Sequence, residues 1–163
     1  MRERLLGSID AGVALDDLRG RKVNYDSATA PMDGRPQGHW HADASDAVIG
    51  QEPPGPPLAG GIWERACNLV RRYEFTDPDI VRAVYRRDDE LLGRDMLLEG
   101  RFFGMRFYFG VRITGVVDET RGGGGAAERV WGWSYQTLEG HLEQGRLSYE
   151  VIKHLASGKV TFR

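Results

Sequence analysis

The chain has 163 residues and a net charge of −2, with 40% hydrophobic and 28% charged residues. This length and mixture are typical of a globular protein that forms a single domain, residues 1–163, with its own hydrophobic core, and they argue against a disordered chain. The slightly acidic balance, without clustered Lys and Arg, argues against a nucleic-acid-binding or anionic-membrane-binding protein.

The single cysteine, Cys67, excludes an internal disulfide and favours a reducing compartment. The sequence has no apolar run long enough to span a membrane, and its start has too short an apolar run for a signal peptide. These features predict a cytoplasmic protein. The pattern around Cys67 places this thiol on the buried side of a helix, where it is expected to be an inert packing residue.

The N-terminal part of the sequence gives few structural signals. Residues 1–37 are weakly patterned, with a short helical turn expected at 15–18 before Gly20 and a short extended piece at 23–25. Residues 38–50 can form a strand, although their alternation is poor. Residues 51–61 contain four prolines and three glycines, so they predict a loop, which we interpret as a connection more readily than as a flap.

One segment has the spacing of a helix. Between residues 62 and 73, Ile62, Ala66, Leu69 and Tyr73 recur every three or four positions, with charged residues on the opposite side. The remaining pattern predicts strands, and the run 103–118 alternates so regularly that one face, carrying Phe107 and Phe109, is expected to be buried. The other expected strands are 80–86, 95–102, 129–138, 146–153 and 159–163.

Glycine makes up 22 residues, and four of them at 122–125 predict a flexible hairpin connection that lacks the pattern of a phosphate-binding loop. Many strands at short spacing with one good helix predict an α+β fold, in which a curved antiparallel sheet packs on one main helix.

His141 is the main candidate for catalysis. It lies between Glu139 and Glu143, and a histidine oriented by a carboxylate can act as a general acid or base. No serine or cysteine lies nearby in a recognised nucleophile motif. A turn histidine near solvent is therefore the stronger interpretation, because polar groups in loops are most often only solvated.

His39 and His41 point the same way if they lie on a strand, as two metal ligands would. The sequence places no defined third ligand beside them, and metal sites need three or four. We therefore expect neither a metal site nor another cofactor.

The aromatic residues allow two interpretations, a solid core or the lining of a cavity for a ligand. If there is a cavity between sheet and helix, tryptophan and phenylalanine side chains contact the ligand, and Tyr135, Arg106 and His141 supply polar contacts near its rim. The expected ligand-binding residues are Trp63, Arg106, Phe107, Phe109, Trp131, Trp133, Tyr135 and His141.

Three segments carry a resemblance to a known family. Residues 63–66 read Trp-Glu-Arg-Ala at the start of a helix, and residues 116–119 read Val-Val-Asp-Glu at the end of a strand. The most specific segment is Thr-Leu-x-Gly-His-x-Glu at 137–143. Across residues 38–163 the chain resembles the bacterial and plant family named domain of unknown function nineteen-ninety.

The resemblance implies a helix-grip fold similar to START and birch-pollen-allergen proteins, in which a curved antiparallel sheet wraps a long C-terminal helix around an apolar cavity. It implies no catalytic residues. The family pattern continues past Arg163 into a basic helix, and residues 51–61 are longer than the usual connection. Without that helix the apolar sheet face lacks its cover, which predicts a dimer, a bound partner or a truncated chain.

The function expected from these features is non-catalytic binding of a small hydrophobic molecule. Two alternatives stay open. One is an enzyme of cyclase or hydrolase type that uses His141, and the other is a protein-interaction module or homodimer that uses the sheet face.

Overall fold

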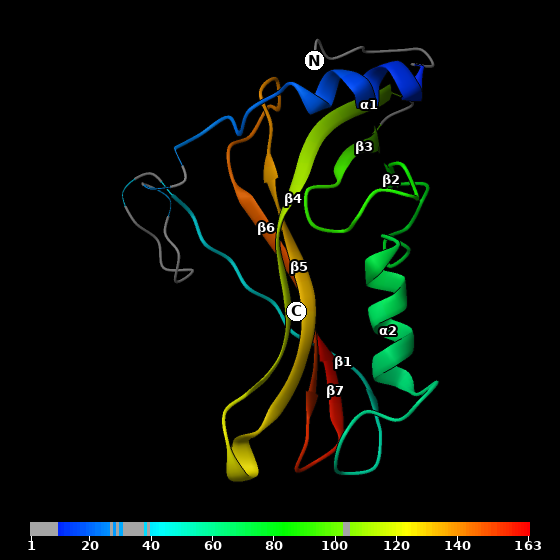
Figure 1. Cartoon of the computed structure of the whole chain (residues 1–163), viewed down its shortest axis with the longest axis vertical. Helices are drawn as coiled ribbons and strands as arrows, with labels where there is room; N and C mark the ends of the chain where they lie inside the picture. The colour runs from blue at the N-terminus through cyan, green and yellow to red at the C-terminus, as the bar shows by residue number, and fades with distance from the viewer. Residues whose placement is uncertain (1–9, 27, 29, 31–37, 39, 103–104) are drawn as a thin grey trace. The chain divides into compact units, whose positions relative to one another are not determined.

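The computed structural model describes residues 10–26, 28, 30, 38, 40–102 and 105–163. Within these residues the chain forms two α-helices and a seven-stranded sheet, in which neighbouring strands follow the order β1-β7-β6-β5-β4-β3-β2 (Figure 1). The elements are α1 Ala11–Arg19, β1 Ala47–Gln51, α2 Ile62–Arg71, β2 Val81–Val84, β3 Asp95–Phe102, β4 Met105–Arg121, the 3-10 turn η1 Gly124–Ala126, β5 Glu128–Thr137, β6 Arg146–His154 and β7 Lys159–Phe162.

The α+β class, the antiparallel sheet and the helix beginning at Ile62 confirm the expectations from the sequence. The expectation of one main helix is wrong, because α1 has nine residues and α2 has ten. The contacts of the chain divide it into two compact units. The first contains Met1–Tyr25, Arg71–Val116 and Ser134–Leu147, and the second contains Asp26–Val70, Val117–Trp133 and Ser148–Arg163.

In the first unit, α1 covers part of the sheet formed by β2, β3 and β4 (Figure 1). The side chain of Asp10 caps the helix by accepting the N–H of Val13 at 3.0 Å, which satisfies one of the unpaired donors of the first turn. The buried face of α1 packs against β3, β4 and the end of β5. The cluster contains Ala14, Leu15, Leu18, Leu97, Tyr108 and Leu138.

The C-terminal end of α1 is held by Arg112 of β4. The Arg112 guanidinium donates to the carbonyl oxygens of Leu18 at 2.8 Å and Arg21 at 3.1 Å, and to the carboxylate of Asp95 at 2.7 Å. Helix carbonyls near the C-terminus have no partner within the helix, and a cation there also interacts favourably with the helix dipole. Arg112 therefore fixes α1 to the sheet.

The position of α1 corrects the expected burial of β4. The alternation predicts that Phe107 and Phe109 are buried and that Tyr108 is exposed, but Tyr108 is 5% exposed while the two phenylalanines are only half-buried. Further along the strand, Val111 and Ile113 are buried as expected. Both faces of β4 are covered in places, because α1 packs on the face that the sequence assigns to solvent.

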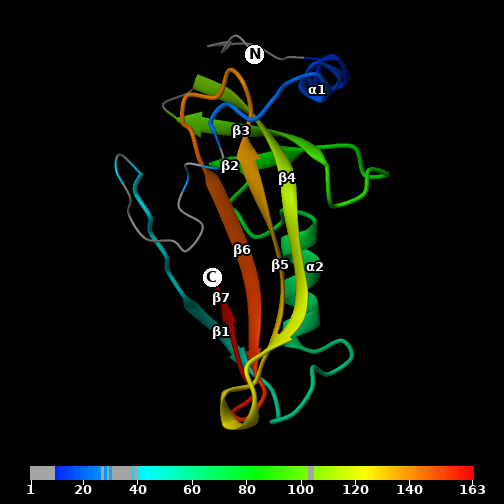
Figure 2. The ribbon, with the colours of Figure 1, turned by 60° about the vertical axis from the view of Figure 1, so that its left-hand side comes forward.

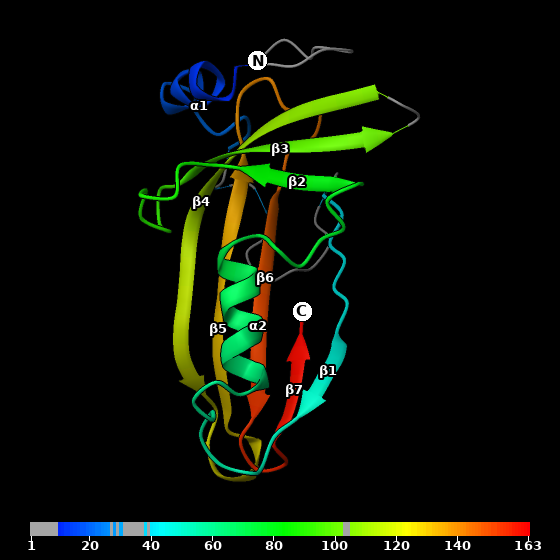
Figure 3. The ribbon, with the colours of Figure 1, turned by 90° about the vertical axis from the view of Figure 1, so that its right-hand side faces the viewer.

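In the second unit, α2 lies beside β5 and β6 (Figure 3). The indole N–H of Trp133 donates to the carbonyl oxygen of Val70 at 3.1 Å, and that of Trp63 donates to the carbonyl oxygen of Val151 at 3.2 Å. Each indole thus combines apolar packing with a satisfied polar edge, which a buried tryptophan requires. These bonds attach both ends of the helix segment 62–70 to neighbouring elements.

The proline-rich loop is fixed by a buried ion pair. Lys153 Nζ lies 2.7 Å from Glu52 Oε2 and donates to the carbonyl oxygen of Pro56 at 2.9 Å, and the Lys153 and Glu52 side chains are 0% and 3% exposed. The other Glu52 oxygen accepts the N–H of Trp63 at 2.9 Å. The loop at 51–61 is therefore a structured connection between β1, which runs beside β7 (Figure 2), and α2.

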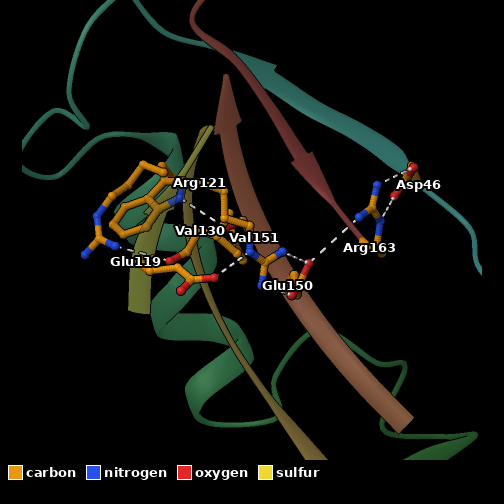
Figure 4. Close-up of polar contacts among 9 residues, drawn as sticks. Asp46, Glu119, Arg121, Val130, Glu150, Val151 and Arg163 are labelled. Carbon is orange, nitrogen blue, oxygen red and sulfur yellow. Dashed lines mark hydrogen bonds and ion pairs between the residues drawn. The ribbon is translucent and has the colours of Figure 1, made fainter. Parts of the chain in front are cut away.

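A chain of ion pairs joins the strands of the second unit (Figure 4). Arg121 pairs with both oxygens of Glu150 at 2.8 and 3.1 Å, and Arg163 pairs with both oxygens of Asp46 at 2.7 and 3.1 Å. The hydrogen bonds that Arg121 donates to the carboxylates of Glu150 and Glu119 raise its pKa above the usual value. Arg163, the residue after β7, also lies 3.9 Å from Glu150, so these pairs connect β4, β6 and the end of β7 with the residue before β1.

The glycine-rich hairpin between β4 and β5 has a defined conformation. The N–H groups of Ala126 and Ala127 donate to the carbonyl oxygens of Gly123 and Gly124, both at 3.3 Å, and form η1. The expectation of a hairpin is confirmed, and residues of its tip form η1.

Candidate functional site

The turn after β5 is built around Asn24. Its side-chain oxygen accepts the hydroxyl of Thr137 at 2.6 Å, its side-chain nitrogen donates to the carbonyl oxygen of Glu143 at 2.8 Å, and its backbone oxygen accepts the side-chain N–H of Gln144 at 2.8 Å. The Thr137 hydroxyl oxygen in turn accepts the N–H of Gly145 at 3.0 Å. Asn24 therefore connects both ends of the turn, and the sequence alone gave no signal for this role.

The residues of the Thr-Leu-x-Gly-His segment have different roles. Thr137 belongs to the hydrogen-bond network of Asn24, and Leu138 is 0% exposed in the core under α1. Gly140 has φ 85°, a left-handed conformation that favours glycine. Three of the four residues thus build the turn, and His141 is the one whose side chain is presented at its surface, half-buried.

The imidazole of His141 is oriented by the turn and by Phe109. His141 Nδ1 accepts the backbone N–H of Glu143 at 3.0 Å, and the ring centroid lies 5.1 Å from that of Phe109. The rings of Phe109 and Phe107 are nearly parallel, with centroids 6.4 Å apart and an interplanar angle of 4°. We call Phe107, Phe109 and His141 the aromatic strip.

The bond from Glu143 decides which nitrogen of His141 carries the proton. Because Nδ1 is an acceptor, a neutral imidazole in this orientation has its hydrogen on Nε2. The strip therefore combines two half-buried phenyl rings with one half-buried imidazole. This arrangement can bind an apolar molecule that carries a hydrogen-bond acceptor.

The other predicted ligand-binding residues lie elsewhere in the fold. Trp63, Trp131 and Trp133 belong to the second unit, where Trp131 is 4% and Trp133 is 2% exposed. Trp133 packs edge-on against Tyr149, and the Arg129 guanidinium lies over the half-buried Trp63 ring at 5.4 Å. These contacts are typical of core packing, which was one of the two interpretations of the aromatic residues.

Arg106 and Tyr135 belong to the first unit together with the aromatic strip. Tyr135 is 9% exposed. Arg106 is exposed and next to Phe107 in β4, so the alternation of the strand directs the two side chains to opposite sides. The structure therefore places Arg106 apart from the strip.

Arg106 instead belongs to a group of arginines around Glu99. The Glu99 side chain is 3% exposed; its Oε2 lies 2.8 Å from Arg82 Nη2 and its Oε1 lies 2.9 Å from Arg101 Nε and 3.9 Å from Arg106 Nε. Burial opposes the ionisation of Glu99, but the hydrogen bonds from Arg82 and Arg101 outweigh it and hold the pKa of the carboxyl below its usual value. We call Arg82, Arg101 and Arg106 the arginine cluster.

The arginine cluster was missed in the sequence, although a signal for part of it exists. Glu99 and Arg101 have the same parity in one strand, so they share a face of the sheet. The register then adds the two neighbouring strands, because Arg82 pairs with Glu99 and Arg106 pairs with Arg101.

His41 is exposed, and His39 lies outside the described residues. In the described part of the chain, no three or more His, Cys, Asp or Glu residues form a group that could hold a metal ion. Cys67 is 6% exposed, in agreement with the expected packing role. None of the described helices has the length and apolar character needed to cross a membrane.

Comparison with curated proteins gave no match, and comparison with solved structures gave none either. The family model described as domain of unknown function (DUF1990) matches residues 24–163, a range that begins at Asn24 and contains both the aromatic strip and the arginine cluster. The chain therefore belongs to the DUF1990 family.

Proposed function

We propose that the protein binds a small, largely apolar molecule at the aromatic strip and does not convert it chemically. The observation that carries this proposal is the aromatic strip itself, in which the His141 imidazole, oriented by the Glu143 N–H at Nδ1, lies against the half-buried Phe109 ring. Half-buried rings supply apolar contact area, and a polar group beside them supplies orientation.

The same bond argues against His141 as a general base. A general base needs an unprotonated nitrogen within reach of the substrate proton, but in the neutral ring Nδ1 accepts from the backbone and Nε2 already carries hydrogen. Protonation of Nδ1 would replace this hydrogen bond with two opposed N–H groups. The turn therefore favours a donor role, which suits a ligand with a carbonyl or hydroxyl oxygen.

The family resemblance points in the same direction. A helix-grip fold similar to START and birch-pollen-allergen proteins places an apolar cavity against a curved antiparallel sheet, and the antiparallel sheet of this chain is compatible with that class. We propose that this chain has a helix-grip fold as well.

Titration with Nile Red tests the proposal, because this neutral dye is planar, apolar and carries a carbonyl acceptor. The wild-type protein should give a saturable rise in fluorescence. Phe109→Ala should weaken binding roughly tenfold or more, because the contact area of a phenyl ring contributes about 1.5–3 kcal/mol when it is fully buried. His141→Ala should weaken it about two- to tenfold through loss of one neutral hydrogen bond.

Two further variants make the result specific. Phe109→Leu keeps most of the side-chain volume and guards against a fold defect in Phe109→Ala, which circular dichroism would reveal. Leu58→Ala changes an exposed side chain of the second unit and should leave the Kd unchanged. Fluorescence that does not saturate, or equal affinities for the wild type, Phe109→Leu and His141→Ala, would refute binding at the strip.

A further inference from the structure

The arginine cluster holds more positive charge than the fold requires. Three guanidinium groups from β2, β3 and β4 surround one buried carboxylate, that of Glu99. Asp79, 91% exposed, approaches Arg101 at 3.8 Å and is well solvated. Even when Asp79 is counted, three positive charges face two negative ones, so the cluster has a net positive charge.

The register makes this arrangement costly. Arg101 and Arg106 are directly opposite each other on β3 and β4, and like charges in this position destabilise a sheet. Glu99 offsets only part of the repulsion, because it makes close contacts with Arg82 and Arg101 while Arg106 stays 3.9 Å away, beyond hydrogen-bond distance. A bound anion would complete the neutralisation.

The geometry also orients the arginines. Glu99 fixes the Nη2 end of Arg82 and the Nε edge of Arg101, so these two side chains are held from below by a carboxylate that is almost inaccessible to solvent. The side chains of Arg82, Arg101 and Arg106 are 47%, 31% and 46% exposed. The partly exposed guanidinium groups have further N–H donors besides those bonded to Glu99, and the fork geometry of a guanidinium matches phosphate oxygens.

We propose that the arginine cluster is a binding site for a phosphate monoester group, separate from the aromatic strip. A tetrahedral dianion fits better than a carboxylate because it can accept hydrogen bonds from three guanidinium groups at once and neutralises the excess charge. The site lies on the side of β4 opposite to Phe107 and Phe109, so it does not depend on the function proposed for the strip.

The test is calorimetric titration with inorganic phosphate at constant ionic strength, with chloride as the reference anion. Wild-type protein should bind phosphate saturably. Arg106→Gln should weaken phosphate binding about tenfold, as expected for loss of one charge-assisted hydrogen bond. Arg106→Lys should have an affinity between those of the wild type and Arg106→Gln, because it keeps the charge but loses the fork geometry of the guanidinium. Arg72→Gln, which changes an exposed arginine paired with Glu74, should bind like the wild type.

A second arm identifies the source of the phosphate group. Co-sedimentation with vesicles that contain phosphatidic acid, abolished in Arg106→Gln and retained in Arg72→Gln, would support the site and assign it to a lipid headgroup. Saturable binding of inorganic phosphate with the same dependence on Arg106, without co-sedimentation with the vesicles, would support a soluble phosphate monoester. If neither probe binds, or if Arg106→Gln, shown by circular dichroism to be folded, binds both as well as Arg72→Gln does, the proposal is wrong.

Discussion

Lys153 and Glu52 form the most deeply buried ion pair among the described residues of the second unit. Removing two charges from water is costly, and the cost is offset only when each charge finds several partners. Lys153 has the carboxylate and the carbonyl oxygen of Pro56, while Glu52 also accepts the N–H groups of Trp63 and Leu58. The pair thus links β6, the proline-rich loop and the start of α2.

Glu52→Gln should lower the free energy of unfolding by about 3–5 kcal/mol, because it leaves Lys153 as a buried charge without its counter-ion. Urea denaturation followed by circular dichroism measures this change. The double variant Glu52→Gln, Lys153→Met should recover part of the loss, since no buried charge remains. A loss below 1 kcal/mol in the single variant would contradict a buried and coupled pair.

The same carboxyl predicts how stability depends on pH. Burial opposes the ionisation of Glu52, but the hydrogen bonds from Lys153, Trp63 and Leu58 outweigh it, so the pKa lies below the usual 4.5. A depressed pKa contributes stability that is fully present above pH 4.5 and is lost as the pH falls through the folded-state value. As the pH is lowered through this range, the urea midpoint should fall less steeply for Glu52→Gln than for the wild type. Parallel plots of urea midpoint against pH for the two proteins would contradict the lowered pKa of Glu52.

At the scale of elements, the attachment of α1 depends on Arg112. Arg112→Met keeps the aliphatic stem but removes the donors to the carbonyls of Leu18 and Arg21, and it leaves the buried Asp95 without this partner. Hydrogen bonds to charged groups contribute about 1.5–3 kcal/mol each, so we expect a loss of about 3 kcal/mol or more.

Hydrogen exchange localises this effect of Arg112→Met. The amides of α1 should exchange much faster than those of β3 and β4, because the helix is released from the sheet while the strands keep their pairing. Arg19→Gln is the matched control, since Arg19 is 59% exposed and approaches Asp16 only at 3.9 Å. Equal protection of α1 in both variants would show that Arg112 does not hold the helix.

The elements that the sequence predicted are those with local signals. The spacing around Ala66 marks α2, and the strand alternation marks β3, β4 and β6 within a few residues of their observed bounds. Most of α1 was missed because its hydrophobic stripe is narrow and its C-terminal clamp comes from Arg112, 94 residues away from Leu18. Burial of Tyr108 follows from this helix and could not be read from β4 alone.

The candidate site, like the fold, could be predicted only where the sequence carries a local signal. His141 and the glycine before it were marked by a local motif, whereas Asn24 fixes the turn from 113 residues away. The tryptophans stood out by their number, yet their indole N–H groups bond to Val70 and Val151 inside the second unit. The strip at Phe109 and His141 depends on a ring contact between β4 and the turn, which the pattern of a single strand cannot give.

At the scale of the whole molecule, the two proposed sites belong to the first unit and lie on opposite sides of β4. In the second unit the side chains discussed above make ion pairs and core contacts, such as Lys153 with Glu52 and Arg121 with Glu150. Both proposed recognition sites thus belong to one unit, and the donor role proposed for His141 depends on the tautomer of its imidazole.

Long-range proton–nitrogen NMR of the His141 imidazole, with and without saturating Nile Red, tests this claim directly. At neutral pH we expect the hydrogen on Nε2, because Nδ1 accepts the Glu143 N–H. Nile Red should shift the Nε2 and ring-proton resonances of His141, and His41, exposed and remote in sequence, serves as the internal control. A ring protonated at Nδ1, or His141 resonances that stay unchanged when the dye is bound, would contradict the account.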